Sequence, residues 1–344
     1  MKVVAYYGPG NFSVEDHPVP DISDGEMRIE VMAVGICGTD VHKAVHQTVK
    51  DGTVLGHEVA GIVDEVGSNV SKFQVGDRVT LAHHAPCMTC HQCFKDHHSL
   101  CDQYLKNNII PGGFSQYIRV LPEHVRETIY PIRKAETTFE EAAFMEPLAC
   151  CLRGFMKLDF RVGDSVLILG AGPIGLQFVM LARAFNAGTV GVTDLNDQRL
   201  TLASQLGADL TINPQSSDIS TTLDATGLSG GFDNVVITVG AAPLYEQGIA
   251  LAGKGASILV FAETPEGQTI SLEPNAIYTK ELRIVGSYSS SPYHLQTALA
   301  LIESGRIPVK SLISDRISLE EVGDGIERSH RATDCLKIMI LPNG

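Results

Sequence analysis

The stretch from Gly163 onwards constrains the fold more than any other part of this 344-residue chain. Short apolar runs, beginning with "DSVLILG", alternate there with longer runs at helical spacing, such as "DQRLTLASQLGA". Continuous apolar strands separated by helices are typical of a parallel sheet that helices cover on both faces. We therefore expect a doubly wound α/β domain, and we place it at residues 151–287.

A glycine motif stands between the first of these strands and the helix that follows it. The run "LILGAGPIGLQ" has the spacing G-x-G-x-x-G. In a strand–loop–helix context this pattern is typical of a dinucleotide site, because the glycines allow a tight turn, approach of the pyrophosphate and close helix packing. The helix N-terminus then faces the phosphates. The residues expected to contact the dinucleotide are Gly170, Gly172, Pro173, Ile174, Gly175 and, after a later strand, Val239 and Gly240.

An acidic residue ends the next strand, "TVGVTD". The carboxylate of Asp194 at this place accepts the ribose hydroxyls of NAD and repels the 2′-phosphate of NADP. A helix cap or turn is the alternative role for this residue. Arg199 is expected to cover the adenine, or alternatively to bind the 2′-phosphate. The sequence therefore favours NAD as the cofactor.

The first part of the chain has a different pattern. Short strand-like runs over Met27–Val34, His57–Gly67 and Gly76–Ala82 are separated by Gly and Pro. Such punctuation predicts an all-β, partly barrel-like domain. A helix follows in "TTFEEAAFMEPLACCLRGF", where Thr138 and Glu141 form a capping-box pattern. The helical spacing continues until Pro147 disturbs it.

Four of the chain's 8 cysteines lie in one short run, "CMTCHQCFKDHHSLC". Disulfides, a redox pair, an iron–sulfur cluster and zinc are the candidate explanations. A reducing compartment disfavours disulfides, a redox motif needs one pair only, and ferredoxin spacing differs from this one. Four thiolates on one loop fit a closed, structural zinc site, which we favour over the cluster. The proposed ligands are Cys87, Cys90, Cys93 and Cys101.

The net charge and the hydropathy of the sequence disfavour nucleic-acid and membrane partners. The formal net charge of −14 disfavours a nucleic-acid partner, because phosphate binding needs clustered cations. No signal peptide is visible at the N-terminus, and Gly-Pro interrupts the apolar run Val166–Ala182. We therefore expect a cytoplasmic protein without a membrane partner.

A second set of metal-binding residue types is spread over three separate runs. "GICGTDVH", "LGHEVAG" and "FMEPLACC" supply cysteine, histidine and carboxylate side chains. These are ligand types for a catalytic zinc that keeps one position open. The first run supplies Cys37, Thr39, Asp40 and His42, the second His57 and Glu58, and the third Glu146.

Taken in order, "GICGTDVH", "GHEVAGIVDEVG", the four-cysteine run, "GGFSQY", "EPL" and "GAGPIGL" resemble the zinc-dependent medium-chain alcohol dehydrogenases. The resemblance is to the polyol (sorbitol or iditol) and threonine dehydrogenase branch, and it covers nearly the whole chain. It implies a GroES-like, barrel-like catalytic domain at 1–150 and 288–344. A Rossmann NAD-binding domain at 151–287 is inserted into it.

The resemblance also implies residue roles. Cys37, His57 and Glu58 match the catalytic zinc ligands, with water completing the site. Glu146 matches a carboxylate that binds the ion directly or through that water. The remaining matches are Thr39, a hydroxyl that contacts the reacting oxygen; His42, the outer member of a proton relay; and Cys87, Cys90, Cys93 and Cys101, the structural-zinc ligands.

The activity that this resemblance implies is hydride transfer to NAD from a secondary alcohol of a polyol, sugar or sugar acid, in a homotetramer or dimer. L-Threonine 3-dehydrogenase is the alternative. Lys43 and Ser287 stand where polyol enzymes have an aromatic residue and an arginine, so the individual substrate stays open. A zinc-binding interaction module that senses NAD, and a zinc-free quinone reductase, are further classes; the Cys37 set disfavours the first and the two cysteine sets disfavour the second.

Overall fold

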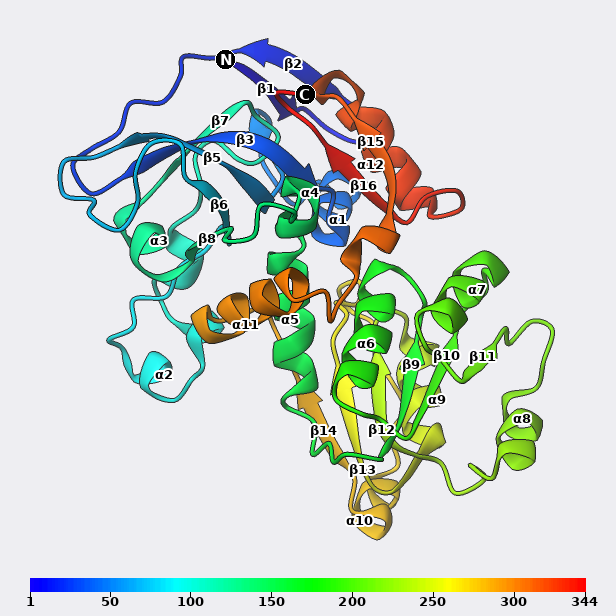
Figure 1. Cartoon of the computed structure of the whole chain (residues 1–344). Helices are drawn as coiled ribbons and strands as arrows, with labels where there is room; N and C mark the ends of the chain where they lie inside the picture. Colours follow the sequence, from blue (N-terminus) through cyan, green and yellow to red (C-terminus); the bar gives the residue numbers. More distant parts are fainter. The chain divides into compact units, whose positions relative to one another are not determined.

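The computed structural model describes residues 1–344, apart from the side chain of Ser220. The chain divides into two compact units. The first unit consists of Met1–Ala149 and Ser290–Gly344, and the second of Cys150–Ser289. The first unit is therefore discontinuous, because the second is inserted into its sequence. Figure 1 shows the elements of both units with the labels used below.

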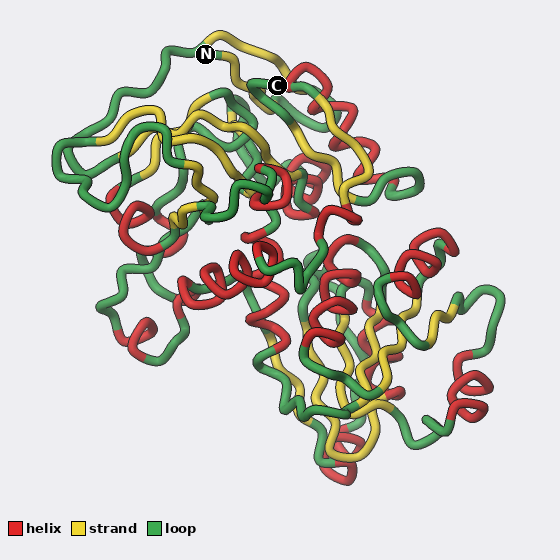
Figure 2. Tube along the Cα trace, in the orientation of Figure 1, coloured by secondary structure: helices red, strands yellow, loops and turns green.

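The second unit is built on one parallel sheet of six strands in the order β11-β10-β9-β12-β13-β14. Its first strand along the chain, β9, is buried at every position, which explains its unbroken apolar sequence "SVLIL". The expected doubly wound sheet is confirmed, and Figure 2 shows its strands side by side in yellow. The strands are β9 (Ser165–Leu169), β10 (Thr189–Thr193), β11 (Leu210–Ile212), β12 (Phe232–Ile237), β13 (Ala252–Val260) and β14 (Arg283–Gly286).

The strand order reverses at β9, which lies between β10 and β12. In open parallel sheets, ligands bind beyond the carboxyl ends of the strands at such a reversal. The glycine motif follows β9 directly, so the fold places it at this point. The helices that connect the strands are α6 (Pro173–Ala184), α7 (Asp197–Gln205), α8 (Ile219–Thr226), α9 (Ala242–Leu251) and α10 (Pro274–Lys280).

The first unit contains a largely antiparallel sheet of seven strands and a smaller one of three strands. The larger sheet has the order β15-β16-β3-β5-β6-β8, with β7 also paired to β3, and only β15 and β16 run parallel. The strands are β1 (Lys2–Tyr6), β2 (Phe12–Asp16), β3 (Met27–Gly35), β4 (Thr53–Val54), β5 (Glu58–Val66), β6 (Arg78–Leu81), β7 (Tyr117–Val120), β8 (Ile129–Pro131), β15 (Ile313–Ile317) and β16 (Lys337–Ile340).

Two features of the first unit's sequence produce its core. The alternating residues of β3 place Ile29 and Val31 inward in one apolar cluster, which also includes Val59 of β5 and Ile338 of β16. Gly61 lets β5 pass close to β3, since a Cβ there would overlap the carbonyl oxygen of Glu30. The last strand, β16, pairs with β3 through Met339 and Ile340, so both segments of this unit share one core.

Helices of the first unit are mostly short. The expected capping box is present in α4: Glu141 N donates to Thr138 Oγ1 at 3.2 Å, and Thr138 N donates to the Glu141 carboxylate at 2.9 Å. The helix ends before Pro147, which lies instead in the first turn of the next helix, where proline is tolerated. The helices are α1 (Gly38–His46), α2 (His91–Phe94), α3 (Pro122–Glu127), α4 (Phe139–Ala143), α11 (Pro292–Glu303) and α12 (Val322–Arg331), with 3-10 turns at His98–Leu100, Tyr104–Lys106, Val309–Leu312 and Leu319–Glu321. Helix α5 (Met145–Phe155) begins in the first unit and continues into the second at Cys150.

Among the residues described, no helix combines the length and the apolar character that a bilayer crossing requires.

Candidate functional site

Cys37 occupies a defined position at the start of a helix. It is the N-cap of α1, directly after β3, and its Sγ accepts a hydrogen bond from Thr39 N at 3.5 Å. The Asp40 carboxylate accepts a hydrogen bond from Cys37 N at 3.0 Å, which completes a capping box. A helix N-terminus favours negative charge, so this position suits a thiolate.

His57 and Glu58 lie beside that thiol because β5 begins there and pairs with β3. Cys37, His57 and Glu58 each offer one potential ligand atom, and these three atoms lie within 4.8 Å of one another. A thiolate, an imidazole and a carboxylate in this arrangement can hold a zinc ion and leave a coordination position open.

Asp40 also orients the imidazole. His57 Nδ1 lies 3.1 Å from Asp40 Oδ1, and the same oxygen accepts a hydrogen bond from Gly56 N at 3.1 Å. A carboxylate on one ring nitrogen fixes the tautomer and leaves the other nitrogen as the ligand. Burial lowers the pKa of His57, but the negative charges of Asp40 and Cys37 outweigh it and hold that pKa well above its usual value.

A lysine from the last strand completes the charge balance. Glu58 and Lys337 are 1% and 4% exposed, and the Lys337 ammonium forms an ion pair with Glu58 Oε2. Burial lowers the pKa of Lys337, but the negative charges of Glu58 and Cys37 raise it above its usual value overall. Within the described chain neither carboxylate oxygen of Glu58 accepts a hydrogen bond of ordinary geometry. Such a buried carboxylate fits a metal ligand, because a cation would satisfy the oxygen that Lys337 does not contact.

The other expected residues of this site are placed as follows. Glu146 is buried on α5 but does not belong to the group of three ligand atoms described above. Thr39 and His42 both lie on α1, three residues apart and therefore on neighbouring turns of one face. The ring of His42 lies 4.5 Å from that of His46.

The four-cysteine run forms a second group. The Sγ atoms of Cys87, Cys90, Cys93 and Cys101 lie within 4.8 Å of one another, and Cys93 and Cys101 are buried. A hydrogen bond from the Thr89 hydroxyl lowers the pKa of the Cys87 thiol to about 6. All eight cysteines are free. Four convergent thiols with no open position fit a structural zinc ion.

In the second unit, each of the three glycines of the motif has a different geometric role. Gly170 has φ +104°, a backbone conformation that favours glycine. A Cβ on Gly175 would overlap the carbonyl oxygen of Gly170, whereas a Cβ on Gly172 would meet open space. The open position is where a pyrophosphate can approach the N-terminus of α6, so the loop fits a dinucleotide.

Asp194 follows β10 beside this loop. Its carboxylate accepts hydrogen bonds from Ala171 N at 2.7 Å and from Asn196 N at 2.8 Å. It therefore fixes the loop's backbone in addition to any contact with a ribose. Arg199 lies in the first turn of α7, half-buried, and Val239 is exposed after β12 with Gly240 beside it.

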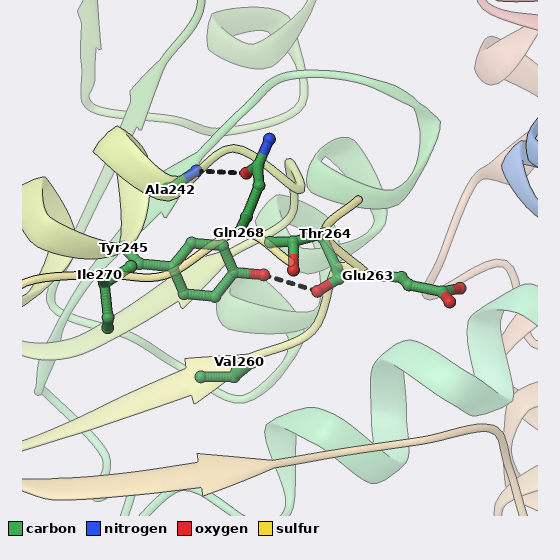
Figure 3. A pocket seen from close by; sticks show the side chains of 8 residues that line it. Ala242, Tyr245, Val260, Glu263, Thr264, Gln268 and Ile270 are labelled. Atoms are coloured by element: carbon green, nitrogen blue, oxygen red, sulfur yellow. Dashed lines mark hydrogen bonds between the residues drawn. The ribbon is translucent and has the colours of Figure 1, made fainter. Parts of the chain in front are cut away.

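The second unit also has a cavity of about 420 Å³ between α9 and the loop after β13 (Figure 3). The hydroxyl of Tyr245 donates to Ala262 O at 2.5 Å, and Gln268 Oε1 accepts from Ala242 N at 3.3 Å. These bonds tie the loop to the helix. None of the lining residues belongs to the glycine motif, but Glu263 lies against Gly240, one of the expected dinucleotide contacts.

Comparison with known proteins decides the family. A family model of the alcohol dehydrogenase GroES-like domain matches residues 23–131, and a model of zinc-binding dehydrogenases matches residues 173–304. Sorbitol dehydrogenase of Bacillus subtilis (strain 168) is 32% identical over 100% of this chain and 98% of that protein. The chain belongs to the zinc-dependent medium-chain alcohol dehydrogenases.

Together with the sorbitol dehydrogenase, a second relative places this alcohol dehydrogenase in the polyol and threonine dehydrogenase branch. L-Threonine 3-dehydrogenase of Rhizobium etli (strain CIAT 652) is 30% identical over 91% of this chain and 90% of that protein. A solved zinc-binding dehydrogenase structure from Sinorhizobium meliloti 1021, bound to NADP, has a TM-score of 0.91 and 33% identity, covering 99% of both chains. The GroES-like and Rossmann folds expected from the sequence are confirmed, and the chain is a zinc-dependent oxidoreductase that uses a nicotinamide cofactor.

Sequence reasoning assigned no role to three side chains around the metal-ligand group of this dehydrogenase. Asp40 orients His57, Lys337 pairs with Glu58, and the ring of His83 lies 4.5 Å from the ring of His57. The capping-box spacing of Cys37 and Asp40 was a local signal for the first. A single lysine within the apolar run "CLKIMIL" was a weaker signal for the second.

A matched pair of glycine variants tests the loop. Gly175→Ala is expected to destabilise the protein by about 2 kcal/mol or more, because the new Cβ overlaps backbone that cannot move freely. Gly172→Ala is expected to leave the free energy of unfolding nearly unchanged but to weaken NADH binding about tenfold, since it fills the approach path. Urea denaturation and NADH fluorescence titration measure the two effects. Equal loss of stability in both variants would contradict this interpretation.

Asp40→Asn tests the orientation of His57. The variant keeps the size of the side chain but removes its charge, so zinc affinity at the Cys37 group is expected to fall by about 10- to 100-fold. Zinc held by the four cysteines serves as the internal control and should be retained. Competition with a chromophoric chelator measures both affinities. An unchanged affinity at the Cys37 group would mean that Asp40 is only a helix cap.

Proposed function

We propose that this protein oxidises a secondary alcohol of a polyol, sugar or sugar acid, with transfer of hydride to NAD. The observation that carries the proposal is the convergence of the half-buried Cys37 with the buried His57 and Glu58. This ligand set has an open position and differs from the closed four-cysteine group, so it suits catalysis. The corresponding domain roles are a catalytic first unit and a cofactor-binding second unit.

In this proposal each chain holds two zinc ions. Cys87, Cys90, Cys93 and Cys101 hold the structural ion, and Cys37, His57 and Glu58 hold the catalytic one. Glu146 reaches the catalytic ion directly or through water. A zinc ion at this place supplies Lewis acidity toward the oxygen of the alcohol.

Two residues of α1 provide a path for the proton that the alcohol loses. The hydroxyl of Thr39 contacts the reacting oxygen and takes up its proton while releasing its own toward the nicotinamide ribose and His42, which passes a proton on toward solvent. Their spacing of three residues on one helix supports this pairing. Histidine suits the outer position because its charge changes near neutral pH.

The cofactor preference rests on the end of β10. The Asp194 carboxylate beside the glycine loop supports NAD, because it repels a 2′-phosphate. NAD accepts the hydride when it is bound. Gly170, Gly172, Pro173, Ile174 and Gly175 cradle the pyrophosphate, and Arg199, Val239 and Gly240 contact the rest of the dinucleotide. The Sinorhizobium relative is bound to NADP, so a comparison of both cofactors is part of the test.

Charge near the metal ligands supports an acidic or phosphorylated substrate. Burial and then the charge of His57 lower the pKa of His83, and Lys43 contributes to the same shift. Lys43 also contributes to the shift that lowers the pKa of His84 to about 4, after burial and other charges. Lys43 lies in the last turn of α1, the helix that Cys37 caps, so its positive charge supports an anionic substrate. The threonine dehydrogenase relative makes L-threonine the second candidate substrate.

We further propose that the protein works in the cytoplasm as a homodimer or tetramer. The eight free cysteines support a reducing compartment. The edge of the six-stranded sheet supports association, because β14 is its last strand and Ile284 on it is 40% exposed. An apolar edge strand is a template for pairing with a second copy.

A substrate panel tests the proposed reaction. With NAD, sorbitol, xylitol, an aldonate and a sugar-alcohol phosphate are expected to give higher kcat/KM than ethanol or L-threonine. Lys43→Met is expected to lower kcat/KM for the anionic substrates about tenfold, which is about 1.4 kcal/mol, and to leave neutral polyols unaffected. Metal analysis should find two zinc ions per chain. Fastest turnover of ethanol would overturn the proposal, and fastest turnover of L-threonine would favour the second candidate.

Ile284→Lys tests the proposed association. A charge on the edge of β14 is expected to shift the protein toward monomers, as measured by sedimentation velocity at several concentrations. Val75→Lys is the matched control, because Val75 is also exposed but lies outside the sheet edge. If both variants keep the mass of the wild-type protein, β14 is not the interface.

A further inference from the structure

The ion pair of Glu58 and Lys337 is unusual for its burial. The two residues begin β5 and β16, which both belong to the larger sheet of the first unit. The Lys337 ammonium contacts Glu58 Oε2 and donates a hydrogen bond to the carbonyl oxygen of Ile36 at 2.9 Å. Long charged side chains are rarely buried unless they are paired, so this lysine has a defined partner.

Gly35 makes space for the pair. A Cβ at this position would overlap Glu58 Oε2 and would lie 2.8 Å from Lys337 Cε. Any side chain at the end of β3 would therefore displace the carboxylate or the lysine stem. Gly35 therefore leaves the space in which the buried carboxylate of Glu58 and the buried ammonium of Lys337 lie in contact.

The two carboxylate oxygens of Glu58 have different contacts. Oε2 lies against the ammonium of Lys337, and Oε1 accepts no hydrogen bond within the described residues. A divalent cation held with Cys37 and His57 would use the same carboxylate. Lys337 and that cation then compete for one negative charge and also repel each other, and both effects are strong in a buried site.

We propose that Lys337 is a positioning residue that shares the Glu58 carboxylate with the metal ion. This sharing lowers the zinc affinity of the Cys37 group and speeds zinc dissociation. This inference rests on the proposed zinc site. Lys337 keeps Glu58 partly neutralised, so the carboxylate binds zinc less tightly than an unpaired one. An exchangeable carboxylate ligand leaves a coordination position that an incoming oxygen can take.

The test measures zinc affinity of the purified full-length protein rather than its activity. Lys337→Met keeps an apolar stem and removes the charge, and Lys337→Arg keeps the charge. Competition with a chromophoric chelator at one fixed pH is expected to show affinity at the Cys37 group raised about tenfold or more in the methionine variant. The arginine variant should stay within about threefold of wild type. Zinc dissociation from the methionine variant should slow correspondingly.

A Glu58→Gln background separates action through Glu58 from direct repulsion. There the gain in zinc affinity from Lys337→Met is expected to be at least about threefold smaller than in the protein that keeps Glu58, because only the direct repulsion remains. If Lys337→Met does not fold, Lys337→Gln carries the same expectation, since its amide can still donate to Ile36 O.

Several results would overturn the inference. These are an unchanged or lower affinity in a folded Lys337→Met protein, or an equal gain in both backgrounds. Such results leave the proposed function intact as long as the wild-type chain holds two zinc ions. A wild-type chain that binds zinc only at the four cysteines would instead refute the proposed function itself.

Discussion

Compensation of buried charge is the constraint on which the first unit depends. Asp40 and Glu58 bring negative charge into the interior beside the half-buried Cys37, and isolated ions there would be strongly destabilising. His57 and Lys337 supply positive charge from β5 and β16, and a zinc ion supplies more. The backbone around β3 and α1 is arranged to bring these groups together, so fold and chemistry in this unit have one common physical cause.

Features that depend on short sequence spacing could be predicted. The glycine motif, the four-cysteine run and the Thr138 capping box each lie within a single loop or helix turn, where spacing fixes geometry. The parallel sheet of the second unit was predictable as well, because strands buried on both faces have unbroken apolar sequences. The individual roles of Gly172 and Gly175 then follow from the loop itself.

Features that depend on pairing of distant strands could not be predicted. The register of β16 against β3 brings Lys337 to Glu58, and nothing near either residue specifies that register. The break between α4 and α5 was also misplaced, since Pro147 is compatible with a first helical turn. Ligand types alone made the Cys37 group a candidate, and its convergence depended on resemblance to a family, because its members come from separate runs of the chain.

The discontinuity of the first unit has a consequence for biogenesis. During synthesis, the residues of the second unit leave the ribosome as one continuous segment before β15 and β16 exist. The Rossmann unit can therefore fold first. At that stage β3 lacks its neighbouring strand β16, and Glu58 lacks the ammonium of Lys337. A nascent chain in this state exposes an unpaired sheet edge and an incomplete metal-binding site at the same time. Metal insertion and protection by chaperones therefore both act before β15 and β16 are in place.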